Sequence, residues 1–94
     1  MKTDNLLERD LTIVNRRGLH ARASAKLVKL VERFRADVQV SRDGQTVGGT
    51  SIMGLMMLAA SPGCCITVRV SGEDAEEALA AISELVETGF GEKD

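Results

Sequence analysis

The sequence predicts an α/β (α+β) open-faced sandwich, in which four antiparallel strands carry three helices on one face. Two observations lead to this class. Segments of alternating and of helical periodicity follow one another in the order β-α-β-β-α-β-α. The strand segments also alternate apolar with polar residues, so the sheet should have one solvated face and the helices should all cover the other. The length of 94 residues fits one domain over residues 1–94.

The first half of the chain is expected to form three strands and one helix. Residues 8–14 alternate weakly as a strand, whereas residues 21–34 place apolar side chains at helical spacing and turn basic ones away from them. Residues 36–41 alternate cleanly as a second strand. The pair Asp43-Gly44 is typical of a tight hairpin turn, so residues 45–49 should return as a short third strand.

The second half is expected to form two helices and one strand. Residues 51–58 should form a short helix, because their first residue is a serine that can cap it. Pro62-Gly63 closes the following loop, and residues 64–71 alternate as the fourth strand. Residues 75–86 follow 3.6-residue spacing with acidic residues early, and Gly89 is the expected stop.

Charge is unevenly distributed along the chain. Residues 1–35 contain nine Lys or Arg against four acids, whereas residues 73–94 contain eight acids and one Lys. The basic segment favours a local anionic ligand or an acidic partner surface. A nucleic-acid partner is not expected, because the net charge is −2 and the chain has no Trp or Tyr on which bases could stack.

Membrane, metal and disulfide roles are also not expected. No apolar stretch approaches the ~18 residues of a membrane span, and Met1–Asn5 does not resemble the start of a secretory leader. Cys64 and Cys65 are adjacent, so a bridge between them would be strained, and they lack the spacing of a zinc site. We therefore expect no cofactor and no metal, and interpret both cysteines as strand residues in a reducing cytoplasm.

The single histidine, His20, stands where the first long helix is expected to begin. The first N–H groups of a helix have no partner inside the helix and stabilise an anion there. Arg22 could reach the same anion with its planar fork of donors, and Arg16 and Arg17 add positive charge in the preceding turn. An imidazole is also a covalent nucleophile. The segment therefore suits phosphoryl chemistry, although a surface or capping histidine without a role is the alternative.

A second candidate feature is the apolar run within residues 50–58. It contains more apolar residues than one face of a short helix can bury, so some should be exposed as a protein interface. Methionine suits such a surface because its side chain adapts to different partners. The alternative, burial in the core, is expected for about half of these side chains. Gly48-Gly49 is interpreted as a sharp exit from the preceding strand.

Two motifs in register with the element order resemble the HPr family, the histidine-containing phosphocarriers of the phosphoenolpyruvate-dependent phosphotransferase system. They are Gly18-Leu19-His20-Ala21-Arg22 and, about thirty residues later, Ser51-Ile52-Met53-Gly54. The resemblance covers residues 9–90. It implies a carrier rather than an enzyme: enzyme I phosphorylates His20 on Nδ1, the group passes to an enzyme IIA-type acceptor, and Arg22 contacts the phosphate.

The same resemblance implies further sites. Ser51 matches the serine that an HPr kinase/phosphorylase modifies in many members. The residues that match the partner-docking surface are Ile52, Met53, Met56 and Arg17. A cytoplasmic monomer, with no membrane or nucleic-acid partner, is expected. Ala23 stands where the family usually has proline, and this resembles a proteobacterial branch that often works in nitrogen-type regulatory relays.

Three other functions stay open at this point. A purely regulatory paralogue would act through Ser51 without relaying phosphate, but the pairing of His20 with Arg22 argues against it. A small α/β module that binds a ligand or RNA is disfavoured by the lack of aromatic residues. A small hydrolase would need an acid/base system around its nucleophile, and the segment around His20 shows none.

Overall fold

The computed structural model describes residues 6–92. The terminal residues 1–5 and 93–94 lie outside this range, including the segment for which no leader was expected. In chain order the elements are β1 (Leu7–Thr12), α1 (Ala21–Val31), β2 (Asp37–Arg42), β3 (Gln45–Gly48), α2 (Ile52–Met57), β4 (Cys65–Ser71), α3 (Ala75–Glu87) and the 3₁₀ turn η1 (Gly89–Gly91). This is the expected element order with one additional turn at the end.

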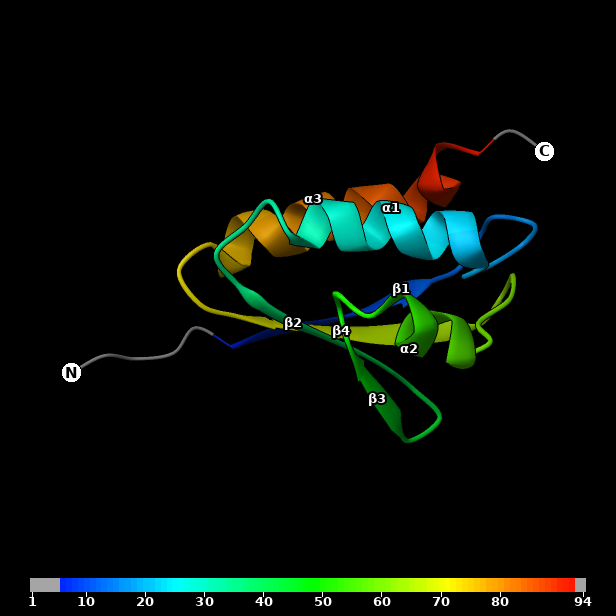
Figure 1. Ribbon diagram of the computed structural model, residues 1–94, viewed down its shortest axis with the longest axis horizontal. Coiled ribbons are helices and arrows are strands. Elements are labelled where there is room, and N and C mark those ends of the chain that lie inside the picture. Colours follow the sequence, from blue (N-terminus) through cyan, green and yellow to red (C-terminus); the bar gives the residue numbers. More distant parts are fainter. Residues whose placement is uncertain (1–5, 93–94) are drawn as a thin grey trace.

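The four strands form one antiparallel sheet in the order β1-β4-β2-β3. Helices α1 and α3 lie side by side over one face of the sheet, and α2 packs against α1 and β3 (Figure 1). The register places Leu11 of β1 opposite Ile66 of β4, and Val40 of β2 opposite Val68. These inward side chains are buried, so the predicted open-faced sandwich is confirmed.

The other face of the sheet is polar. Thr67 donates a hydrogen bond to Asp10 at 2.8 Å, and the hydroxyls of Ser41 and Thr46 are 2.8 Å apart. Inward-facing apolar side chains alternate with these outward polar ones along the strands. The sheet therefore contributes apolar surface to one core only, which it shares with the helices.

Element boundaries differ from the predicted ones by a few residues. The predicted strand over residues 8–14 forms one residue earlier and ends at Thr12, and the first helix ends at Val31 rather than at residue 34. Beyond Val31 the chain is tied to the start of α3, because Arg35 N donates to Asp74 Oδ2 at 2.8 Å. The Asp43-Gly44 hairpin is confirmed, with positive φ values of 51° and 82°.

The turn after α3 was not predicted, and it redirects the chain toward α1. Helix α3 stops just before Gly89, as expected, but Phe90 then adopts φ 58° and buries its ring, which is only 1% exposed. The Lys26 ammonium group on α1 donates to the Phe90 carbonyl oxygen at 2.7 Å. The contact with Lys26 places this turn against α1.

Within residues 6–92, no helix has the length and apolar character that crossing a membrane requires. The same described part of the chain contains no cluster of three or more His, Cys, Asp or Glu side chains that could hold a metal ion.

Candidate functional site

The loop before α1 fixes the position of His20. Gly18 has φ 63°, and a Cβ atom at this position would collide with the Ala60 carbonyl oxygen. Glycine is therefore required here both by conformation and by space. The next residue, Leu19, is buried and donates its N–H to the same oxygen at 3.0 Å. This contact places His20 at the N-cap of α1, where its backbone is extended.

The two ring nitrogens of His20 face different groups. Nδ1 accepts a hydrogen bond from the Arg22 N–H at 3.3 Å, so the imidazole itself caps the helix. Nε2 lies 2.5 Å from the Glu92 carboxylate oxygen Oε2. The His20 side chain is 21% exposed, whereas Glu92 is 9% exposed. Solvent or a partner can therefore reach the ring, but its Nε2 edge is occupied by a nearly buried carboxylate.

Asn15 holds the carboxylate in place. Its side-chain amide donates to Glu92 Oε1 at 3.0 Å and to the Gly18 carbonyl at 2.9 Å. The hydrogen bond from Asn15 holds the pKa of Glu92 below its usual value. Burial opposes this shift, whereas the neighbouring His20 and Lys26 add to it. Glu92 is consequently ionised at neutral pH and can only accept hydrogen bonds.

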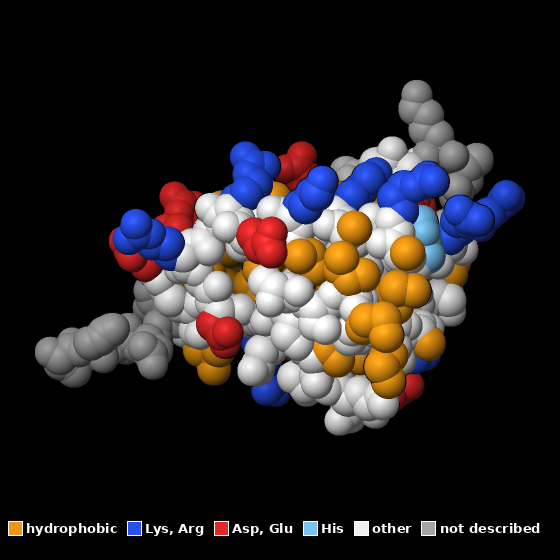
Figure 2. Space-filling model, in the orientation of Figure 1, with side chains coloured by type: hydrophobic (Ala, Val, Ile, Leu, Met, Phe, Trp, Pro, Cys, Tyr) orange, Lys and Arg blue, Asp and Glu red, His pale blue; other side chains and the backbone are white. Residues whose placement is uncertain are grey.

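Positive charge surrounds the exposed edge of the histidine. Arg22 lies exposed on the first turn of α1, and Arg16 and Arg17 lie exposed in the turn before it. Figure 2 shows the histidine at the surface among Lys and Arg side chains that continue along α1. The predicted grouping of a nucleophilic imidazole, a helix N-terminus and basic side chains is therefore present in the folded chain.

Ser51 occupies a similar position at the start of α2. Its hydroxyl oxygen accepts a hydrogen bond from the Gly54 N–H at 2.9 Å, so the predicted N-cap is confirmed. The chain enters this helix through Gly49, where a Cβ atom would lie 2.7 Å from Val38 Cγ1. Space therefore requires glycine at position 49, whereas a Cβ atom on Gly48 would meet no atom within 4 Å. Ser51 is exposed and accessible to a modifying protein.

Helix α2 divides its apolar side chains between the core and solvent. Leu55 and Leu58 are buried, whereas four others form an exposed surface that we call the α2 patch: Ile52, Met53, Met56 and Met57. Met53 is 71% and Met57 69% exposed. Figure 2 shows this apolar surface next to the histidine. The expectation that part of the run is exposed is confirmed, with Met57 as a member that the sequence did not single out.

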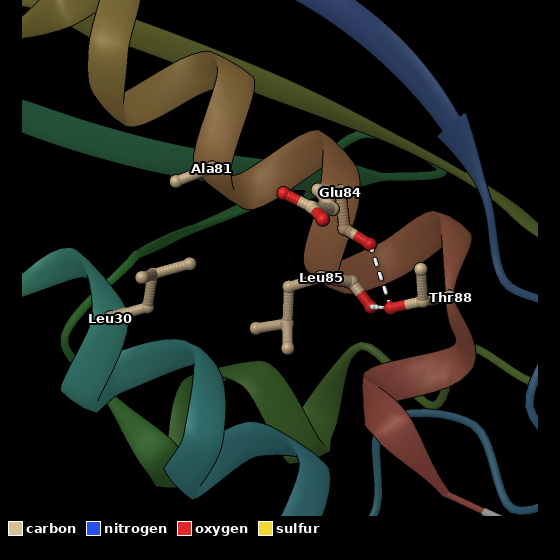
Figure 3. Close-up of a pocket in the computed structure, with 5 residues that line it drawn as sticks. All are labelled: Leu30, Ala81, Glu84, Leu85 and Thr88. Atoms are coloured by element: carbon tan, nitrogen blue, oxygen red, sulfur yellow. Dashed lines mark hydrogen bonds between the residues drawn. The ribbon is translucent and has the colours of Figure 1, made fainter.

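A shallow groove between α1 and α3 does not compete as a reactive site. Its volume is about 280 Å³, and its walls come from Leu30 of α1 and from the C-terminal half of α3 and Thr88 (Figure 3). The Thr88 hydroxyl already donates to the carbonyl oxygens of Glu84 and Leu85. At His20, in contrast, an imidazole, a carboxylate and basic side chains lie together.

Comparison with known proteins identifies the family. Residues 7–88 match the family model for the HPr component phosphorylation site of the phosphotransferase system. The chain is 49% identical over 87 residues to the phosphocarrier protein HPr of Xylella fastidiosa, covering 93% of this chain and 98% of that one. It is 42% identical over 86 residues to the phosphocarrier protein NPr of Shewanella violacea, covering 92% and 94%.

The chain belongs to the HPr family. Solved structures agree: HPr from Thermoanaerobacter tengcongensis superposes with a TM-score of 0.88 at 38% identity, covering 94% of this chain and 99% of that one. HPr from Bacillus anthracis superposes with a TM-score of 0.82 at 41% identity, covering 86% and 96%. HPr proteins are phosphocarriers of the phosphotransferase system rather than catalysts, and their partners include enzyme I and enzyme IIA-type proteins.

Three residues of this HPr site were missed by sequence reasoning: Asn15, Lys26 and Glu92. Glu92 lies 72 positions from His20 and is one of eight acids in the C-terminal segment, so nothing in the pattern distinguishes it. Lys26 looks like any solvent-facing helix residue, and Asn15 like an ordinary turn residue. The only available signal was Gly89-Phe90-Gly91, an apolar residue between two glycines after an acidic helix.

Proposed function

We propose that His20 accepts a phosphoryl group from enzyme I and passes it to an enzyme IIA-type acceptor. The observation that carries this proposal is the place of the ring at the N-cap of α1, with Nδ1 facing the first helical amides. An anionic group bonded to Nδ1 would lie where those N–H groups and the helix dipole stabilise it.

Transfer requires little from the carrier beyond positioning and charge. The imidazole lone pair forms the N–P bond while the bond between phosphorus and the donor breaks. The electron pair of the broken bond leaves with the donor. Arg22 lies two residues after the nucleophile and offers donors for the equatorial phosphoryl oxygens. Transfer to the acceptor reverses these roles, so the carrier emerges unchanged.

Docking is assigned to the α2 patch and the neighbouring basic turn. Ile52, Met53 and Met56 present apolar surface beside the histidine, and Arg17 is exposed in the adjacent turn. A partner that covers this surface buries apolar area and places its own reactive group at His20. A partner with acidic residues at the rim would complement the arginines.

Ser51 is proposed as a site of regulatory phosphorylation by an HPr kinase/phosphorylase. A phosphate at this N-cap is compatible with α2, because the first helical amides stabilise it. It would add about −1.5 to −2 charge beside the α2 patch. Desolvating that charge in a complex with enzyme I is costly, so the modification should weaken docking. We further propose that the protein works as a cytoplasmic monomer.

The proposal is tested by incubating the protein with enzyme I and phosphoenolpyruvate and measuring its intact mass. Wild type should gain one acid-labile phosphoryl group and lose it to an added enzyme IIA-type acceptor. His20→Ala should fold normally and gain none, because the chain has no other histidine. An acid-labile phosphoryl group on His20→Ala would overturn the assignment.

A further inference from the structure

We propose that Glu92 is a positioning residue for His20, whose carboxylate holds the Nε2 proton and so leaves Nδ1 as the nitrogen that bonds to phosphorus. The inference rests on the proposed function of His20. It goes beyond that function because it assigns a task to a residue at the far end of the chain, 72 positions away.

The argument begins with the protonation states of the two partners. Glu92 is ionised at neutral pH and accepts hydrogen bonds only, so at 2.5 Å from Nε2 it requires a proton on that nitrogen. A neutral imidazole has one N–H, and Nδ1 must then bear the lone pair. The Arg22 N–H donates to Nδ1 at 3.3 Å, which is consistent with this tautomer.

The carboxylate is held by parts of the fold that are themselves fixed. The Phe90 ring is buried and the Lys26 ammonium binds the Phe90 carbonyl oxygen, so the chain two residues before Glu92 is anchored at both side chain and backbone. Asn15 then binds Glu92 Oε1, which leaves Oε2 for the histidine. The ring thus contacts a carboxylate that is itself held by hydrogen bonds from other parts of the fold.

The same contact also stabilises the positive charge that develops on the imidazole ring during transfer. When Nδ1 bonds to phosphorus and Nε2 keeps its proton, the ring becomes an imidazolium. The Glu92 carboxylate lies against that proton and balances the new positive charge, as an orienting carboxylate does for a catalytic histidine. When the phosphoryl group leaves, the N–P electron pair returns to Nδ1 and the ring is neutral again.

Glu92→Gln provides a sharp test because Asn15 dictates the orientation of the new side-chain amide. Asn15 donates a hydrogen bond, so the oxygen of the introduced amide should face Asn15 and its NH₂ group should face Nε2. A donor at Nε2 favours the opposite tautomer, with the proton on Nδ1. Glu77→Gln is the matched control, since it makes the same change at an exposed position at the other end of α3.

The tautomer is read from long-range ¹H–¹⁵N spectra of ¹⁵N-histidine protein, without enzyme I, over a pH series and at its alkaline end, where the imidazole signals no longer change with pH. Wild type and Glu77→Gln should show the proton on Nε2, and Glu92→Gln should show part of it moved to Nδ1, a shift that the Arg22 N–H donating to Nδ1 limits. Phosphorylation of Glu92→Gln by enzyme I should be slower by about tenfold or more, and circular dichroism should show the variant folded at the temperature of the assay. An unaltered tautomer, or a rate equal to that of Glu77→Gln, would overturn the role of Glu92.

The two proposals fail in distinguishable ways. If wild type takes up no phosphoryl group at His20, the proposed function is wrong whatever the spectra show. If wild type is phosphorylated on His20 but the tautomer in Glu92→Gln matches wild type, the function stands and the positioning role is wrong.

Discussion

The two ring nitrogens of the His20 imidazole contact chemically different groups. The first-turn amide of Arg22 faces Nδ1, and Glu92 faces Nε2. The guanidinium of Arg22 is exposed and therefore available to a transferring phosphoryl group. An arginine can place two donors on neighbouring phosphoryl oxygens, whereas a lysine offers a single point charge.

Arg22→Ala is therefore expected to fold like wild type and to be phosphorylated more slowly by enzyme I, by about tenfold or more. Arg22→Lys should recover only part of the rate. Arg33→Ala, which removes an exposed cation beyond the end of α1, is the matched control and should behave as wild type. The comparison is made with single-turnover phosphorylation rates. Equal rates for the alanine variants at positions 22 and 33 would show that the helix N-terminus and the other arginines suffice.

At the scale of elements, helix α2 has some apolar side chains that pack into the core and others that face solvent. Leu55 and Leu58 fix it to the core, and Ser51 caps its start, so the remaining apolar side chains are free to contact a partner. Met53 is the most exposed of the α2 patch, and its replacement should leave the packing of the helix intact.

Met53→Asp should weaken binding to enzyme I by about tenfold or more, because the new carboxylate must be desolvated in the complex. Leu6→Asp introduces the same charge at another exposed apolar residue, 64% exposed and outside the patch, and should leave binding unchanged. Titration followed by NMR chemical shifts provides both affinities. An unchanged affinity for Met53→Asp would place this residue outside the interface.

The type and start of an element were predictable from the sequence where the local residue pattern determines them. The boundaries were less predictable where a tertiary contact ends the helix or strand. The Asp43-Gly44 hairpin and the Ser51 cap follow from residue type alone. The predicted length of α1 was too great, because the Arg35 N–H binds Asp74 at the start of α3 instead of continuing the helix. The same contact explains why Asp74, at the N-cap of α3, makes no side-chain capping bond.

At the scale of the whole molecule, the site forms only when the two ends of the described chain meet. Asn15 and Glu92 are 77 positions apart, and in the sequence each one looks like an ordinary solvent-exposed residue. His20 and Arg22 could be predicted because motif and helix start coincide locally. Their carboxylate partner could not, because it depends on the turn that buries Phe90.

This long-range contact predicts a pH dependence of stability. Because the pKa of Glu92 is lower in the folded chain than its ordinary value of 4.5, the charged form stabilises the fold above that value. The contribution should be lost as the pH falls through the lowered pKa. Urea unfolding should therefore show wild type more stable than Glu92→Gln at pH 5 to 6, with the difference shrinking below 4.5. A difference that is constant with pH would contradict this linkage.

The claim that His20 carries the phosphoryl group on Nδ1 is tested most directly by NMR of the phosphorylated protein. The ¹⁵N-histidine protein is phosphorylated with enzyme I and phosphoenolpyruvate, and ³¹P–¹⁵N couplings are recorded together with long-range ¹H–¹⁵N correlations. Because the chain has one histidine, the spectrum reports a single imidazole. We predict phosphorus coupled to Nδ1 with the proton retained on Nε2. Phosphorus on Nε2, or a phosphorylated protein whose imidazole spectrum is unchanged, would contradict the account.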